Sequence, residues 1–90
     1  METGPKLLAL LAETGALRQL SPSDEKVQKK IGELQAFITE NYYNCTDEIL
    51  DGLGKMYVGD ERMKGNIDKA GGEGTAEFVK EAISVYCQGR

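Results

Sequence analysis

Histidine is absent from this 90-residue sequence, and its absence removes much of the catalytic chemistry that a protein can perform. No other side chain has an unperturbed pKa that lies near neutrality. Histidine-dependent catalytic triads and histidine-containing zinc sites are therefore excluded. The two cysteines are too few for a structural zinc site, and the chain has neither a Walker-type phosphate loop nor a Gly-x-Gly-x-x-Gly fingerprint. We expect a protein that is not an enzyme and holds no cofactor and no metal.

Basic residues are the scarcer charged class, because eleven Lys and Arg stand against fifteen Asp and Glu, for a formal net charge of −4. This balance repels phosphate and no local basic cluster offsets it, so this chain alone should not contact nucleic acid. No apolar run reaches the roughly 18 residues of a membrane span. The Ala/Leu-rich N-terminal run has no basic region before it and no clear cleavage site after it. We expect a cytoplasmic protein with reduced thiols and no membrane contact.

The composition that remains, 40% apolar and 29% charged, is typical of a small globular domain. A chain of this size buries only roughly 60 to 65% of its unfolded surface, so its core should be thin. Apolar residues recur at steps of three and four almost throughout, and no segment alternates as a half-buried strand does. The sequence predicts one all-α domain over residues 1–90, with four helices after an N-terminal helical segment, residues 1–20, that resembles the end of a longer element.

Residues typical of helix starts mark the boundaries between the predicted helices. The residues expected to open the four later helices are Ser21, Thr46, Asp60 and Thr75. Pro22 would be a favourable first helical residue, and Asp24 would place an acid in the first turn. Gly59 should end the third helical segment in a left-handed conformation.

Apolar side chains of each predicted helix fall on one face. The N-terminal segment carries Leu7, Leu8, Leu10, Leu11 and Leu17. The residues expected to point inward from the second helical segment are Val27, Ile31, Leu34, Ile38 and Tyr42, and those from the third are Ile49, Leu50, Leu53, Met56 and Tyr57. Those expected from the fourth are Met63 and Ile67, and those from the last are Phe78, Val79, Ala82, Ile83 and Tyr86. Gly52 and Gly54 interrupt one of these helices, at a cost of roughly 1 kcal/mol each relative to alanine. They indicate either close helix packing or space left for a ligand.

Several aromatic and flexible side chains could form the wall of a binding cleft, since such walls combine apolar area with a few polar groups. The alternative is that these side chains only fill a small core. Cys45 has the same two interpretations: a small buried hydrophobe, or a thiol activated before a helix N-terminus. Asp47 and Glu48 would oppose that activation. The candidate ligand-binding residues are Tyr42, Tyr43, Cys45, Leu53, Met56, Tyr57, Met63, Ile67 and Phe78.

An ordered series of motifs between residues 38 and 83 points to a known family. It includes a Tyr-Tyr-x-Cys corner, a Gly-Leu-Gly-x-Met-Tyr-Val helix, an Asn-Ile-Asp segment and a closing Gly-Thr-Ala-Glu-Phe helix. In this combination the sequence resembles the TipAS antibiotic-recognition domain of MerR-like drug-responsive transcriptional activators. The resemblance implies a globin-like domain of four to five helices around an apolar cleft for large hydrophobic or peptide-like antibiotics, such as thiopeptides.

The same resemblance implies a ligand sensor, or a resistance module that sequesters drugs, in which DNA contact comes only through a fused winged-helix domain. One branch of the family captures thiopeptides covalently through a cysteine near the corner, and Cys45 is the candidate in that region. The alternative function is a structural or protein-interaction module without a small-molecule ligand. The identity of the ligand and the oligomeric state stay open.

Overall fold

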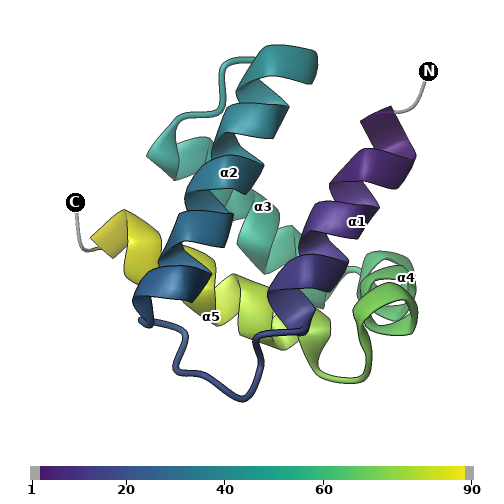
Figure 1. Ribbon diagram of the computed structural model, residues 1–90. Coiled ribbons are helices and arrows are strands. Elements are labelled where there is room, and N and C mark those ends of the chain that lie inside the picture. Colours follow the sequence, from purple (N-terminus) through teal and green to yellow (C-terminus); the bar gives the residue numbers. More distant parts are fainter. Residues whose placement is uncertain (1–2, 89–90) are drawn as a thin grey trace.

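The computed structural model describes residues 3–88, with side chains from residue 6 onward, and within this range the chain is entirely helical (Figure 1). The helices are α1 (Thr3–Gly15), α2 (Glu25–Asn41), α3 (Asp47–Gly59), α4 (Glu61–Gly71) and α5 (Thr75–Gln88). The predicted all-α class is therefore confirmed, and the N-terminal segment supplies the first of five helices. No helix in the described range is long and apolar enough to cross a membrane.

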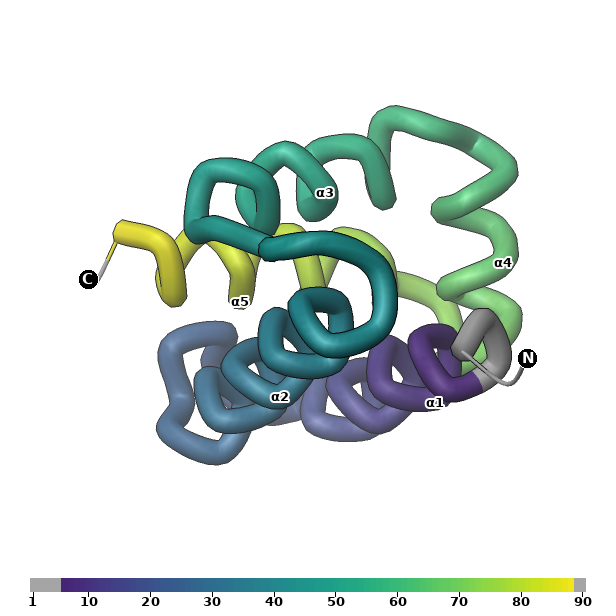
Figure 2. Tube along the Cα trace, turned by 90° about the horizontal axis from the view of Figure 1, so that it is seen from above, coloured from purple at the N-terminus to yellow at the C-terminus, as the bar shows by residue number. Residues whose placement is uncertain are grey.

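Helix α5 lies at the centre and contacts each of the other four helices. Seen from above, α1 and α2 run side by side on one side of α5, and α3 lies on the other (Figure 2). Helix α4 closes one end of the molecule and contacts α1, α3 and α5. This arrangement leaves α1 and α3 joined through α4 rather than packed directly on each other.

Most of the buried apolar residues lie on the inward faces of α2 and α5, as the helical spacing predicted. The confirmed core residues on these two helices are Val27, Ile31, Leu34, Ile38, Phe78, Val79, Ala82 and Ile83. Tyr42 does not join them, and that prediction was wrong: α2 ends at Asn41, so the helical register no longer carries the next tyrosine inward, and its side chain is 46% exposed.

Helix α3 buries a narrower stripe than its sequence predicted. Leu50, Gly54 and Tyr57 are buried at steps of four and three, because this line of the helix packs against α5. Ile49 and Met56 lie seven residues apart on a neighbouring face and are 40% and 42% exposed, so their predicted burial was wrong. Helix α3 therefore presents large apolar side chains to solvent.

The predicted start of α2 at Ser21 was wrong by three residues. Asp24 is the N-cap, and its carboxylate accepts a hydrogen bond from the Lys26 N–H at 2.9 Å. Ser21 instead closes a turn before the helix, in which its backbone carbonyl accepts from the Asp24 N–H at 2.9 Å and its hydroxyl accepts from the Ser23 N–H at 3.2 Å. Asp24 is the better cap because its negative charge lies at the N-terminus of α2, where the helix dipole is positive, whereas Ser21 is uncharged.

The three other predicted helix starts are confirmed, whereas the predicted conformation of one helix end is wrong. Thr46 accepts from the Ile49 N–H at 3.2 Å, and Asp60 accepts from the Arg62 N–H at 2.9 Å, so both capping predictions are confirmed. Thr75 is the first residue of α5, as predicted. Gly59 is the last residue of α3, as predicted, but it does not adopt the predicted left-handed conformation; in the described chain, positive φ angles occur only at Gly72 and Gly74, between α4 and α5.

Of the two glycines that interrupt α3, Gly54 serves helix packing and Gly52 does not. A Cβ atom at Gly54 would lie 3.3 Å from the Ile83 Cδ1, so this glycine allows α3 and α5 to approach closely. A Cβ atom at Gly52 would meet nothing within 4 Å. Close helix packing is therefore the role of Gly54, whereas neither glycine lines the pockets described below.

Arg18 joins the ends of three helices just after α1. Its Nη1 lies 2.8 Å from the Gly15 carbonyl at the end of α1, 2.6 Å from the Gly71 carbonyl at the end of α4, and 2.9 Å from the Thr75 Oγ1 at the start of α5. A cation is favoured beside two helix C-termini because their carbonyls carry partial negative charge. The residue thus holds α1 against α4.

Candidate functional site

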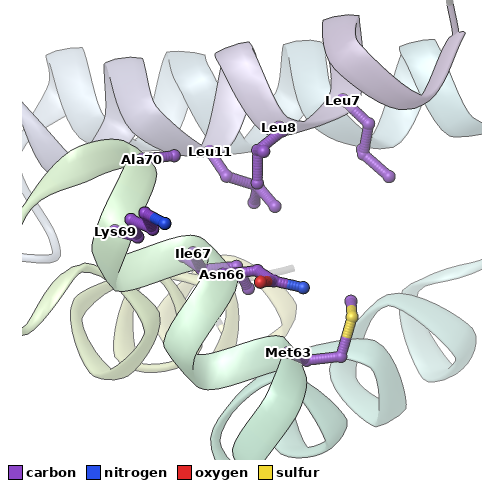
Figure 3. A pocket seen from close by; sticks show the side chains of 8 residues that line it. All are labelled: Leu7, Leu8, Leu11, Met63, Asn66, Ile67, Lys69 and Ala70. Atoms are coloured by element: carbon purple, nitrogen blue, oxygen red, sulfur yellow. The ribbon is translucent and has the colours of Figure 1, made fainter.

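Two adjoining apolar pockets form the candidate site. The larger pocket, of 390 Å³, lies between α1 and α4, and its lining residues are Leu7, Leu8, Leu11, Met63, Asn66, Ile67, Lys69 and Ala70 (Figure 3). The smaller pocket, of 170 Å³, is lined by Leu7, Ile38, Tyr42, Tyr43, Leu53, Met56, Tyr57 and Met63. Because both include Leu7 and Met63, the two pockets meet at these side chains, and we call them together the groove.

Helices α1 and α4 supply the walls of the larger pocket. Leucine side chains of α1 point toward α4, and Met63 on α4 points back toward α1 (Figure 3). On α4, the lining residues Met63, Asn66, Ile67 and Ala70 follow steps of three, one and three, which place them on one face of a helix. Small-molecule sites are commonly concave and mostly apolar with few polar groups, and this pocket has that character.

Three of the eight residues that line the smaller pocket are tyrosines. Tyr42 and Tyr43, which follow α2, are 46% and 49% exposed, and Met56 on α3 contributes a flexible thioether beside them. A group of exposed aromatic and methionine side chains is unusual on a protein surface. Where it occurs, it commonly marks a binding surface. A ligand in this pocket would cover them.

Tyr57 forms the floor of the smaller pocket, with only 2% of its side chain exposed. Burial raises the pKa of Tyr57 to about 12, with smaller contributions from Tyr43, Cys45 and Tyr42. The Tyr57 hydroxyl has no hydrogen-bond partner among the residues that the structure describes. Every fully buried polar side-chain atom of those residues does have a hydrogen-bond partner, so the Tyr57 hydroxyl is not fully buried. The hydroxyl therefore keeps some contact with solvent, and it can donate to or accept from a ligand.

Seven of the nine residues expected to bind a ligand line the groove. The six in the smaller pocket are Tyr42, Tyr43, Leu53, Met56, Tyr57 and Met63, and Ile67 lines the larger one. Cys45 and Phe78 line neither pocket and belong to the buried core. The sequence-based selection omitted the whole α1 wall as well as Asn66 and Lys69. The leucine spacing of residues 7–11 indicated an apolar face, but no local signal showed that α4 would lie opposite.

Cys45 has the environment of a structural thiol. It is 4% exposed, its backbone N–H donates to the Thr39 Oγ1 at 3.1 Å, and its carbonyl accepts from the Gln35 amide at 2.9 Å. Burial raises the pKa of the Cys45 thiol, and the nearby Asp47 carboxylate raises it further. The reactive thiolate is thereby disfavoured, so the geometry gives no support to covalent capture at this residue.

A pocket of 490 Å³ beside the start of α2 is a weaker candidate, since its lining consists of Asp24, Glu25, Lys26 and Lys29. These charged side chains come from one turn of chain and offer no apolar wall. Metal binding also lacks a basis in the described residues, where no group of three or more Cys, Asp or Glu residues is placed to hold an ion. The groove is therefore the candidate binding site.

Comparison with known proteins identifies the family of the chain. The sequence model of the TipAS antibiotic-recognition domain matches residues 2–86. The chain is 41% identical over 66 residues to the HTH-type transcriptional activator mta of Bacillus subtilis (strain 168), a match that covers 73% of this chain and 25% of that protein. It is 46% identical over 46 residues to the HTH-type transcriptional activator TipA of Streptomyces coelicolor and of Streptomyces lividans, covering 51% of this chain and 18% of each relative. No solved structure matches the chain significantly.

Proposed function

This chain belongs to the TipAS antibiotic-recognition domain family, and from that premise we propose that its groove binds a large, mainly apolar, peptide-like antibiotic of the thiopeptide type. The observation that carries the proposal is the meeting of two apolar pockets at Leu7 and Met63. A single elongated ligand can occupy both pockets, whereas a small drug fills only one.

The lining suits ligands of varied shape. Unbranched methionine side chains adapt to different surfaces, and tyrosines combine a large apolar face with a hydroxyl that can orient a ligand. Each Å² of apolar surface removed from water contributes about 25 cal/mol, so covering the exposed faces of Tyr42, Tyr43 and Met56 would supply a large share of the affinity. Binding of this kind is reversible and needs no contribution from Cys45.

The proposed setting is an effector-sensing module of a cytoplasmic transcriptional regulator. The relatives are HTH-type transcriptional activators, and the chain spans no more than about a quarter of their length. DNA contact would then come from another part of such a regulator, since this chain has a net charge of −4. The same groove would serve equally in a module that only sequesters the drug.

Thermal or urea unfolding with a panel of thiopeptides and other hydrophobic antibiotics tests the proposal. A ligand at 100 times its dissociation constant adds about 2.7 kcal/mol to the free energy of unfolding. Met63→Trp, which fills the junction of the two pockets, should abolish most of this gain. Ile49→Trp, on an exposed site outside both pockets, is the matched control and should retain it.

Absence of stabilisation by every compound would contradict the proposal and favour the alternative of a protein-interaction module. An equal gain in Met63→Trp and in the wild type would place the ligand outside the groove. Both outcomes are read from the same titration, provided that the variant without ligand shows a cooperative unfolding transition.

A further inference from the structure

We propose that Lys69 makes the larger pocket selective for ligands whose apolar body ends in an anionic group, such as a carboxylate or a sulfonate. The inference rests on the proposed function of the groove and adds the polarity of the ligand's end. It concerns which of several apolar compounds the groove prefers.

The charge distribution around the groove is the first observation. Acidic residues outnumber basic ones by fifteen to eleven in the chain, yet no carboxylate lines either pocket. Lys69 is the only cationic side chain among the lining residues of the two pockets. The local charge at this end of the groove is therefore opposite in sign to the net charge of the chain.

The ammonium of Lys69 is also available to a ligand. Some lysines of the described chain are ion-paired: Lys64 lies 3.6 Å from Glu77 and Lys55 lies 3.2 Å from Asp51. Within the described part of the chain, no carboxylate oxygen lies within 4.0 Å of the Lys69 Nζ.

Asp68, the acidic residue next to Lys69 in the sequence, already interacts with other groups. One carboxylate oxygen of Asp68 accepts from the Ala76 N–H at 2.9 Å, and the other lies 3.9 Å from the Lys64 Nζ. Asp68 is thus held at the start of α5 and does not neutralise the neighbouring Lys69.

Asn66 strengthens the same preference. It lies three residues before Lys69 on α4, so the two side chains are neighbours on the helix, and both line the larger pocket (Figure 3). Its amide group supplies a second hydrogen-bond donor to a carboxylate or sulfonate. The other lining residues of this pocket are apolar, so the anionic group of a bound ligand would be held by these two side chains.

A matched pair of fluorescent probes tests the inference. 1-Anilinonaphthalene-8-sulfonate and N-phenyl-1-naphthylamine share one aromatic frame, and only the first carries a sulfonate. Lys69→Met keeps an unbranched side chain and should weaken binding of the sulfonate probe by about two- to fivefold, as expected for an exposed ion pair. The neutral probe should bind both proteins equally, and Lys69→Arg should keep the wild-type preference.

Lys26→Met is the control for net charge. Lys26 is exposed near the start of α2, about 18 Å along the helix from Ile38 at the groove, so its charge is screened at an ionic strength of about 0.1 M. Its replacement should leave the affinity of both probes unchanged. The sulfonate preference of the wild type should disappear near 1 M salt, where the Debye length falls to about 3 Å.

The outcomes separate this inference from the proposed function. If the neutral probe binds and Met63→Trp blocks it, but Lys69→Met weakens the sulfonate probe no more than Lys26→Met does, the role of Lys69 is overturned while the groove stands. If Met63→Trp leaves the binding of both probes unchanged, or the neutral probe does not bind, the groove itself fails as the site and the inference fails with it.

Discussion

At the scale of single residues, Tyr57 combines deep burial with a hydroxyl that has no protein partner in the described chain. Most buried tyrosines hydrogen-bond to the protein. This one lies at the floor of an open pocket, so water or a ligand is the natural partner for its hydroxyl. The raised pKa of Tyr57 reports the same environment, because burial penalises the charged tyrosinate.

The first prediction at this scale concerns stability at high pH. The pKa of Tyr57 rises from about 10 in the unfolded chain to about 12 in the folded one. The folded state therefore holds the proton more tightly, and this contribution to stability is full below about pH 10 and is lost as the pH rises toward 12. In urea unfolding, the wild type should lose about 1 kcal/mol more than Tyr57→Phe between pH 9 and pH 11.

Tyr42→Phe is the control, since it removes an exposed hydroxyl and retains Tyr57. Its stability should fall with pH as the wild type's does. Parallel curves for wild type and Tyr57→Phe would show that the Tyr57 hydroxyl is well solvated and would remove its assignment to the pocket floor.

Residues whose role depends on local chemistry were predictable from the sequence. Thr46 and Asp60 cap helices because their side chains reach N–H groups two or three residues ahead, and that reach involves no distant contact. Cys45 was not decidable in this way. Whether its thiol reaches a ligand depends on how the corner after α2 packs, and the structure places it in the core.

At the scale of helices, the partner of each helix decides which apolar residues are buried. Helix α5 contacts all the others, so Phe78, Val79, Ala82 and Ile83 are core as the periodicity predicted, whereas Tyr86 near its end is only half-buried and its predicted burial was wrong. Helix α3 packs closely on α5 at Gly54, so Ile49 and Met56 are left outside the contact. Hydrophobic periodicity predicts that a face is apolar, but it does not show how much of that face a neighbour will cover.

The prediction at this scale concerns Arg18, whose guanidinium lies between the ends of α1, α4 and α5. Arg18→Met keeps much of the aliphatic stem but leaves two helix C-termini without their cation. We expect a loss of about 1 to 3 kcal/mol in the free energy of unfolding, from lost hydrogen bonds to a charged group. Because α1 and α4 form the larger pocket, ligand affinity should fall as well.

Arg62→Met provides the matched control on α4, since its exposed side chain forms no ion pair or hydrogen bond in the described chain. Its effect on stability should stay within about 0.5 kcal/mol. Equal effects of the two substitutions would mean that the junction at Arg18 does not hold α1 in place.

At the scale of the whole molecule, the groove arises from residues distant in sequence. Leu7 comes from α1, Ile38 from α2, and Met63 from α4. The class of fold was predictable because period and caps act locally, and the resemblance over residues 38–83 directed attention to α3 and α4. The α1 wall was not predictable from either source, since only the packing of α1 on α4 turns the leucines of residues 7–11 into a pocket lining.

The last prediction concerns the groove as one site with two ends. Leu8 lines only the larger pocket and Met56 only the smaller one, so a ligand that spans both should lose affinity when either side chain is truncated to alanine. Each change should cost up to roughly 2 kcal/mol, because the ligand then buries less apolar surface. Isothermal titration of Leu8→Ala, Met56→Ala and the double variant should give costs that add within about 0.5 kcal/mol, as expected if the two side chains contact different ends of one ligand. A short ligand should instead respond to one truncation only. If a large thiopeptide also responded to only one, the two pockets would be separate sites, and the span of the ligand across Leu7 and Met63 would have to be abandoned.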